Sequence, residues 1–137
     1  MITLSDGSTS ITLTDDLLRT DEHGWSPVRQ GVTPTLTGAL VIDVSVLQAG
    51  EPITLAGARQ GPDGLPYGLI SRADFSRLRA MSAQPGKVWS LTLRGVTYQV
   101  VWRHEDPPAL DAQDLIDYSD PEDSDWVIPV LKFTRVS

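Results

Sequence analysis

The chain has 137 residues, the size of one folded domain, and we treat residues 1–137 as a single domain. It contains no cysteine, which excludes disulfide bonds, thiolate metal sites and a cysteine nucleophile. Its net charge of −7 argues against general nucleic-acid binding, because attraction to phosphate needs a clustered excess of Lys and Arg. No apolar run approaches the ~20 residues of a membrane span, and the opening residues lack the pattern of a secretion signal. We therefore expect no membrane partner and no export by an N-terminal signal.

The first third of the chain predicts short strands separated by polar turns. Residues 2–4 and 10–14 alternate apolar and polar side chains around an Asp-Gly-Ser turn, which predicts a hairpin. Residues 25–30 could be extended, but Pro27 would confine them to a sheet edge or a bulge. Residues 33–46 are rich in Thr, Val, Ile and Leu and predict one long strand, bent at a glycine, that crosses the molecule.

The middle of the chain predicts one helix and a second hairpin. A strand at 51–56 and an exposed Gly- and Pro-rich loop at 60–67 come first. A helix over 72–83 follows, because apolar residues recur at helical spacing behind the capping residue Ser71. Residues 87–103 then alternate on both sides of an Arg-Gly pair, which predicts two long strands joined by a short loop. One amphipathic helix needs a sheet to lie on, so the remaining chain should supply strands.

The last third begins with an acidic connection at 104–125, whose charges and prolines exclude it from a sheet interior. We expect a solvated excursion with at most one short turn around 109–115. A closing strand at 126–136 returns to the core, with Pro129 placing it at an edge or a bulge. The sequence as a whole predicts a mainly β fold, a barrel or sandwich of about seven to nine strands with the 72–83 helix packed on it.

The search for catalytic and metal-binding motifs finds weak signals. His23 and His104 each stand beside carboxylates, so a small hydrolase can be imagined, but no nucleophile motif accompanies them. The acidic run could attract a hard cation, yet the spacing is wrong for an EF-hand. Counted from Asp120, the glycine turn would fall on Asp125 and the bidentate Glu on Leu131. We expect no enzyme activity, no metal site and no cofactor.

The four tryptophans are the most conspicuous candidates for a binding surface. They could line a sugar or peptide groove, which makes a carbohydrate- or peptide-binding β-sandwich module the alternative function. In alternating strands, however, core or interface positions fit them better. The candidate interface residues are Trp25, Leu36, Leu40, Trp89, Trp102, Arg103 and Trp126.

The order of these elements resembles that of the tail-tube-type β fold of long-tailed bacteriophages. The chain is similar in particular to small tail-tip proteins and to the ring domain of distal tail proteins. The phrases that carry the resemblance are DDLL at 15–18, TLTGAL at 35–40, LTLRG at 91–95 and WRHED at 102–106. The likeness extends over nearly the full chain.

The resemblance implies a structural virion protein, made in the host cytoplasm and located at the phage tail tip. Its partners would be further copies of itself in a ring, with a hexamer favoured, the tail tube protein, and the baseplate hub or other tail-tip proteins. The resemblance supplies no catalytic residues. The 33–46 strand and the 87–103 hairpin would close the ring and line its lumen, where an acidic surface would repel DNA. The N-terminal strands and the 60–67 loop would contact the next ring or the hub.

Overall fold

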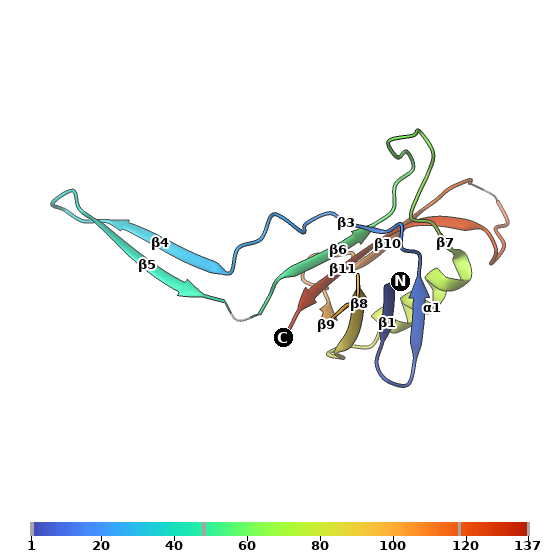
Figure 1. The fold of residues 1–137 in the computed structure, drawn as a ribbon, viewed down its shortest axis with the longest axis horizontal. Coiled ribbons are helices and arrows are strands. Elements are labelled where there is room, and N and C mark those ends of the chain that lie inside the picture. Colours follow the sequence, from blue (N-terminus) through green and yellow to red (C-terminus); the bar gives the residue numbers. More distant parts are fainter. Residues whose placement is uncertain (1, 48, 118, 137) are drawn as a thin grey trace.

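The computed structural model describes residues 2–47, 49–117 and 119–136. It shows a mainly β body carrying one helix, and a two-stranded ribbon that projects from the body (Figure 1). In chain order the elements are β1 (Ile2–Ser5), β2 (Ser10–Leu13), β3 (Leu18–Arg19), β4 (Val28–Pro34), β5 (Leu40–Val46), β6 (Pro52–Ala56), β7 (Ile70–Ser71), α1 (Arg72–Ser82), β8 (Trp89–Leu93), β9 (Val96–Trp102), β10 (Leu110–Asp114) and β11 (Trp126–Arg135).

The body is one antiparallel sheet with the strand order β2-β1-β8-β9-β11-β6-β3. The strands β7 and β10 also pair with β11, which makes β11 the most connected strand of the sheet. The mainly β fold with one helix is thus confirmed. The predicted barrel is not confirmed, because neither sheet closes on itself within the described residues.

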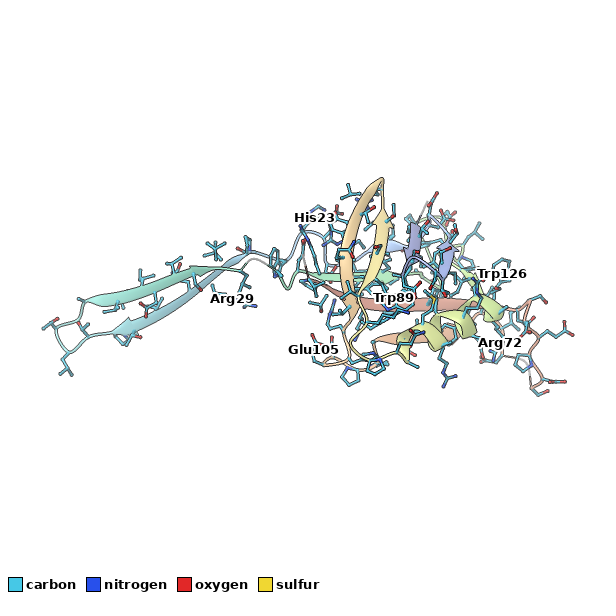
Figure 2. The ribbon with its side chains drawn as sticks, turned by 90° about the horizontal axis from the view of Figure 1, so that it is seen from below. His23, Arg29, Arg72, Trp89, Glu105 and Trp126 are labelled. Atoms are coloured by element: carbon cyan, nitrogen blue, oxygen red, sulfur yellow. The ribbon has the colours of Figure 1, made fainter. Side chains whose placement is uncertain are left out.

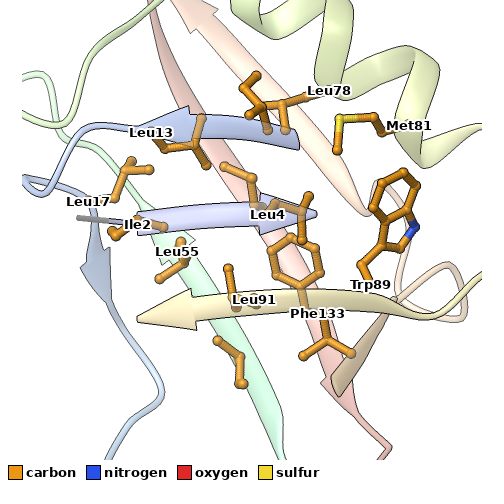
Figure 3. Close-up of a cluster of buried hydrophobic side chains, with 14 of the residues drawn as sticks. Ile2, Leu4, Leu13, Leu17, Leu55, Leu78, Met81, Trp89, Leu91 and Phe133 are labelled. Atoms are coloured by element: carbon orange, nitrogen blue, oxygen red, sulfur yellow. The ribbon is translucent and has the colours of Figure 1, made fainter. Parts of the chain in front are cut away.

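The core lies between α1 and the inward faces of the sheet (Figure 3). Burial alternates along β1, β6 and β8 with the period of two that a half-buried strand requires. The side chains with no exposed surface come from both layers: Leu4, Ile53, Leu55, Leu78, Trp89, Leu91, Val100, Leu131 and Phe133.

The predicted helix and both predicted hairpins are confirmed. The hydroxyl oxygen of Ser71 accepts a hydrogen bond from the Asp74 backbone N–H at 3.2 Å, which caps α1. The helix then turns Leu78 and Met81 onto the sheet. Strands β1 and β2 pair around the first turn, and β8 and β9 pair around Arg94-Gly95. Both of these residues have positive φ, 52° and 79°, as a two-residue turn of the primed type requires.

The predicted single strand at 33–46 is wrong. It contains the end of β4, a turn at 35–39, and β5, so the chain reverses where a bend was expected. The turn is held by hydrogen bonds from the Thr35 N–H to the Ala39 carbonyl (2.8 Å) and from the Gly38 N–H to the Thr35 carbonyl (3.1 Å). Gly38 has φ of +86°, a conformation open to glycine, and this completes the reversal.

The acidic connection differs from the expected solvated excursion in one part. Residues 110–114 form β10 and pair in register with β11, from Leu110 opposite Leu131 to Asp114 opposite Val127. The strand fits because Leu110 and Ala112 pack against the core, while Asp111 and Gln113 are exposed on the opposite face. The remaining acidic residues lie in exposed or partly exposed segments around this strand.

Pro129 lies inside the central strand rather than at an edge, contrary to the prediction. Its carbonyl accepts a hydrogen bond from the Gly57 N–H at 3.0 Å, on the side of β11 where β6 has just ended at Ala56. The N–H and C=O of a strand residue point to the same side, so the missing N–H faces this gap in the ladder. The sheet therefore tolerates proline here without losing a hydrogen bond to β10.

The turn between β1 and β2 depends on one carboxylate. The side chain of Asp6 accepts hydrogen bonds from the Thr9 N–H (2.6 Å) and the Ser8 N–H (2.9 Å), and it pairs with Lys87. These contacts hold the pKa of Asp6 well below its ordinary value of 3.8. The largest cause is the hydrogen bond from Lys87, followed by the hydrogen bonds from the two backbone N–H groups. The contact between Asp6 and Lys87 ties the segment before β8 to the first hairpin.

We predict that Asp6→Asn lowers the melting temperature near neutral pH. A depressed carboxyl pKa contributes stability that is complete above about pH 4 and is lost as pH falls through the folded-state pKa. The difference in melting temperature between wild type and variant should therefore shrink in acid. Thermal unfolding followed by circular dichroism at several pH values checks this, with the exposed Glu105→Gln as a control. A difference that stays constant down to about pH 2 would contradict the prediction.

Candidate interaction surface

The ribbon formed by β4 and β5 projects away from the body (Figure 1), and we call residues 28–46 the arm. Its two strands pair with each other, over Val28 opposite Val46 to Pro34 opposite Leu40, and with no other described strand. Every residue of both strands is exposed. A lone two-stranded hairpin is marginally stable in water, so an arm of this length gains from a surface to rest on.

The register of the arm separates its side chains into two different faces. Residues directly opposite each other in an antiparallel pair share a face, and successive residues alternate. One face carries a run of apolar side chains interrupted by Gln30, and we call it the apolar stripe: Val28, Val32, Pro34, Leu40, Ile42, Val44 and Val46. The other face carries Arg29, Gly31, Thr33, Val41, Asp43 and Ser45.

Within the part of the chain that the structure describes, nothing covers the apolar stripe. The exposed fractions run from 45% at Val28 to 68% at Val46, and Leu36 at the tip of the arm is fully exposed. Large contiguous apolar patches on a protein surface mark sites that bind another molecule. The stripe is therefore the candidate functional site, and its chemistry is that of a protein interface.

The segments before and after the arm are tied into the body by partly buried charges, which we call the base cluster: Arg19, Asp21, Glu51, Arg103 and Arg135. Arg19, before the arm, reaches Glu51, after the arm, with 2.7 Å between Nη2 and Oε1. The second oxygen of Glu51 lies 3.2 Å from Nη1 of Arg135 at the end of β11. The Arg19 side chain is only 7% exposed, so this bridge joins the entering and leaving strands in a partly dry environment.

A second set of contacts in the base cluster fixes Asp21. Its carboxylate accepts hydrogen bonds from the Thr54 N–H (3.0 Å) and the Thr54 hydroxyl (2.9 Å). Arg103 lies 3.6 Å from the same carboxylate and donates to the Phe133 carbonyl at 2.8 Å. The beginning of the segment that leads to the arm is thus held to β6 and β11.

The structure places three of the predicted interface residues at exposed positions. Leu36 and Leu40 both lie on the arm, and Leu40 belongs to the apolar stripe. Trp126 is 53% exposed at the start of β11, and Figure 2 shows it at the end of the body opposite the arm. Trp25 is half-buried in the segment that leads to the arm.

The other three predicted interface residues are internal. Trp89 and Trp102 are 0% and 5% exposed, and Figure 2 shows Trp89 within the body. Both belong to the core and present no ring to a partner. Arg103 is 15% exposed and serves the base cluster. The residues that sequence reasoning missed are those of the apolar stripe other than Leu40, whose signal was alternation on both sides of a Pro-Thr-Leu-Thr-Gly turn.

The two histidines have different surroundings in the structure. His23 is exposed, with its ring 3.7 Å from Glu22. His104 borders a groove of about 470 Å³ between α1 and β10, and its Nε2 contacts the Ser82 carbonyl oxygen at 3.0 Å. In the described part of the chain, no three carboxylate or histidine side chains gather where they could hold a metal. The helix found there is too short and too polar to cross a membrane.

No family model, no curated protein and no solved structure matches this chain. The candidate site is therefore defined by its own geometry. That geometry consists of an exposed arm, an apolar stripe along one of its faces, and a base cluster that holds the segments before and after the arm to the sheet.

We predict that Arg19→Met lowers the free energy of unfolding by about 1–3 kcal/mol, because it leaves the half-buried Glu51 with one ionic partner fewer. Urea unfolding followed by tryptophan fluorescence measures the change. The matched control is Arg94→Met, which removes a 2.9 Å ion pair to Glu22 from a side chain that is 62% exposed. The control should change stability by less than about 1 kcal/mol. Equal effects of the two substitutions would show that the base cluster contributes no more than a surface pair.

Proposed function

We propose that this protein is a structural subunit of the tail of a long-tailed bacteriophage or prophage. Copies of it assemble into a ring at the tail tip, where the ring joins the tail tube to the baseplate hub. The observation that carries the proposal is the arm, an exposed amphipathic ribbon with an uncovered apolar stripe. A monomer gains nothing from an apolar surface held in water, whereas an assembly buries it.

The distribution of charge supports assembly through the arm. Arg29 and Asp43 are the charged residues of the arm, so the arm has no net charge and the rest of the chain carries the whole −7. Copies that repel each other through their bodies can still meet through neutral apolar surfaces. Closed cyclic symmetry is the usual outcome of self-association, and the resemblance of the sequence favours six copies.

The remaining parts of the proposal come from the resemblance of the sequence to phage tail proteins. The tail tube protein and the baseplate hub or other tail-tip proteins are the further partners, and the virion tail tip is the location. The β8–β9 hairpin is our candidate for the ring lumen; because residues 89–102 carry Arg94 and no acidic side chain, any acidic lumen surface that lets DNA slide through would come from other segments. The role is structural and not enzymatic, and it needs no cofactor.

The alternative of a carbohydrate- or peptide-binding module has less support. It needs two exposed tryptophans in one groove, and Trp89 and Trp102 are buried in the core. Trp126 lies at the end of the body away from the arm, whereas Trp25 lies on the segment that leads to the arm. A glycan array with the purified chain tests this alternative, and we expect no binding.

The proposed function is tested on assembled particles. A tagged copy of the chain, expressed from the phage or prophage that encodes it, should be found by immunoelectron microscopy as one ring at the tail tip. Deletion of the coding sequence should yield tails that lack the tip, and expression in trans should restore it. Tails that assemble, keep their tip and infect normally without this chain would refute the proposal.

A further inference from the structure

The groove between α1 and β10, with a volume of about 470 Å³, has closed ends. At one end Arg72, the first residue of α1, pairs with Asp114, the last residue of β10, at 2.8 Å. At the other end the Ser82 carbonyl oxygen contacts Nε2 of His104 at 3.0 Å. The helix and the strand therefore run in opposite directions along the two walls. Eleven helical residues and five strand residues both span roughly 16–17 Å, so the walls have matched lengths.

One wall of this groove is an open edge of the sheet. The Lys132 N–H donates to the Ala109 carbonyl at 2.8 Å, which starts the ladder between β10 and β11. Because bonded and non-bonded pairs alternate in an antiparallel ladder, the backbone groups of Leu110 and Ala112 point away from β11. Pro129, which has no N–H, stands opposite Ala112 and agrees with this alternation. Among the described residues, β10 pairs with no strand other than β11.

Most of the backbone groups along this edge have no partner. The N–H and C=O of Leu110 and the C=O of Ala112 form no hydrogen bond within the described part of the chain. The Ala112 N–H donates to the Asp111 carboxylate at 2.9 Å, a contact that a bound carbonyl group can replace. Donors and acceptors spaced in this way are complementary to a second extended backbone, and strand addition is a recurrent mode of peptide binding. The open edge therefore favours an extended peptide as the occupant of the groove.

A free cation beside the open edge indicates the charge of the occupant. Two other arginines near α1 already bind strand carbonyls: Arg77 donates to Ser10 on the edge strand β2 at 3.0 Å, and Arg59 donates to Asp114 at 2.7 Å. Arg79 instead lines the groove, and its exposed guanidinium group forms no hydrogen bond or ion pair with any described residue. A carboxylate is the group that such a guanidinium binds best.

The helix wall sets the order of the side chains in the peptide. Phe75 and Arg79 both line the groove and lie four residues apart, roughly 6 Å along the helix axis. Side chains on one face of a strand lie roughly 6.6 Å apart, so two residues separated by one can contact both. An antiparallel strand on β10 runs in the same direction as α1, and antiparallel pairing is the more stable kind. Phe75 then precedes Arg79 along the bound peptide.

We propose that β10 binds an extended, acidic peptide segment of a partner protein as an added antiparallel strand. An apolar side chain of the segment lies opposite Ala112 and against Phe75, and a carboxylate two residues later lies opposite Leu110 and against Arg79. The groove accommodates about five residues, so the contact is weak and reversible. This site goes beyond the proposed tail role, and it does not involve the arm.

The probe for this site is the peptide acetyl-Thr-Val-Thr-Glu-Thr-amide, titrated into the ¹⁵N-labelled full-length chain. We expect saturable changes in the amide resonances of Leu110, Ala112 and α1, and slower hydrogen exchange of the Leu110 N–H. A control peptide in which Val and Glu are exchanged has the same composition and should bind several-fold more weakly. Equal affinities, resonance changes centred on the arm, or no change at the solubility limit of the peptide would each overturn the proposal.

N-methylated peptides test the main-chain contacts with the wild-type chain. Methylation of the Glu amide removes the donor to the Leu110 carbonyl, so binding should be lost. Methylation of the central Thr amide, which points away from β10 in the bound peptide, should leave the affinity within a few-fold of that of the parent peptide. Equal effects of the two methyl groups would show that the peptide is not added as a strand in this register.

Charge reversal tests the role of Arg79. Arg79→Glu should weaken binding of the Glu peptide by about tenfold and strengthen binding of a peptide with Lys in its place by a similar factor. The matched control is Arg29→Glu, which makes the same change in net charge on the arm and should leave both affinities unchanged. Both arginines are exposed, and circular dichroism checks that both variants fold. Equal responses of the two variants would show a general effect of net charge and would remove Arg79 from the site.

Discussion

Replacing Leu78 with alanine is expected to lower the free energy of unfolding by about 2–5 kcal/mol. Leu78 has no exposed surface and points from α1 onto the sheet, beside Met81 and the strands β1 and β2 (Figure 3). The substitution removes buried methyl groups and leaves a cavity that the rigid sheet cannot collapse to fill. Equilibrium urea unfolding measures the loss as a shift of the midpoint at constant slope.

The same helix provides the control for this prediction. Ser76 lies two residues before Leu78 and is exposed, so Ser76→Ala should change the free energy of unfolding by less than about 0.5 kcal/mol. If Leu78→Ala had an effect as small as that of Ser76→Ala, the packing of α1 on the sheet would be wrong. A loss of cooperativity in the variant would indicate instead that α1 is needed for a single unfolding transition.

The helix α1 and the β1–β2 and β8–β9 hairpins could be predicted because the sequence signals for them are local. The Ser71 cap, the apolar face of α1 and the Arg94-Gly95 turn each depend on residues a few positions apart. Strand β10 was missed for the opposite reason. Its acidic composition suggested a loop, although Leu110 and Ala112 alternate with polar residues as in any half-buried strand.

The arm could not be recognised from the sequence. Alternation of apolar and polar residues indicates that one face of a strand is apolar, but it does not indicate whether another part of the protein covers that face. The stripe from Val28 to Val46 has the same pattern as a core-facing hairpin, yet it lies in water. Conversely Trp89 and Trp102, predicted as interface candidates, have the pattern of a strand and are covered by the core. The base cluster was equally invisible, since Arg19 and Glu51 meet across 32 positions of sequence.

The arm can be removed without opening the body, which separates folding from assembly. The Leu47 N–H donates to the Pro27 carbonyl at 2.7 Å, so the chain ends that remain after deletion of residues 28–46 are already in hairpin register. An Asn-Gly dipeptide closes such a gap as a type I′ turn. Because the arm strands pair with none of the body strands among the described residues, the armless chain should keep its melting temperature within a few degrees.

Assembly should nevertheless be lost in the armless chain. Without the stripe, a ring loses the contact that each copy makes to the next, and avidity effects of this kind are worth on the order of 10²-fold or more. We therefore expect the number of infectious particles to fall by about that factor when the armless chain replaces the wild type.

A pair of point variants sharpens the test. Ile42→Asp places a charge on the apolar stripe, whereas Thr33→Asp places the same charge on the opposite face of the arm. Ile42→Asp should reproduce the armless defect and Thr33→Asp should assemble. If the armless chain folds, enters tails and supports infection at the wild-type level, the arm is not the assembly element. If the armless chain fails to fold, the arm contributes to the core. That result would contradict the exposure of every residue along both arm strands.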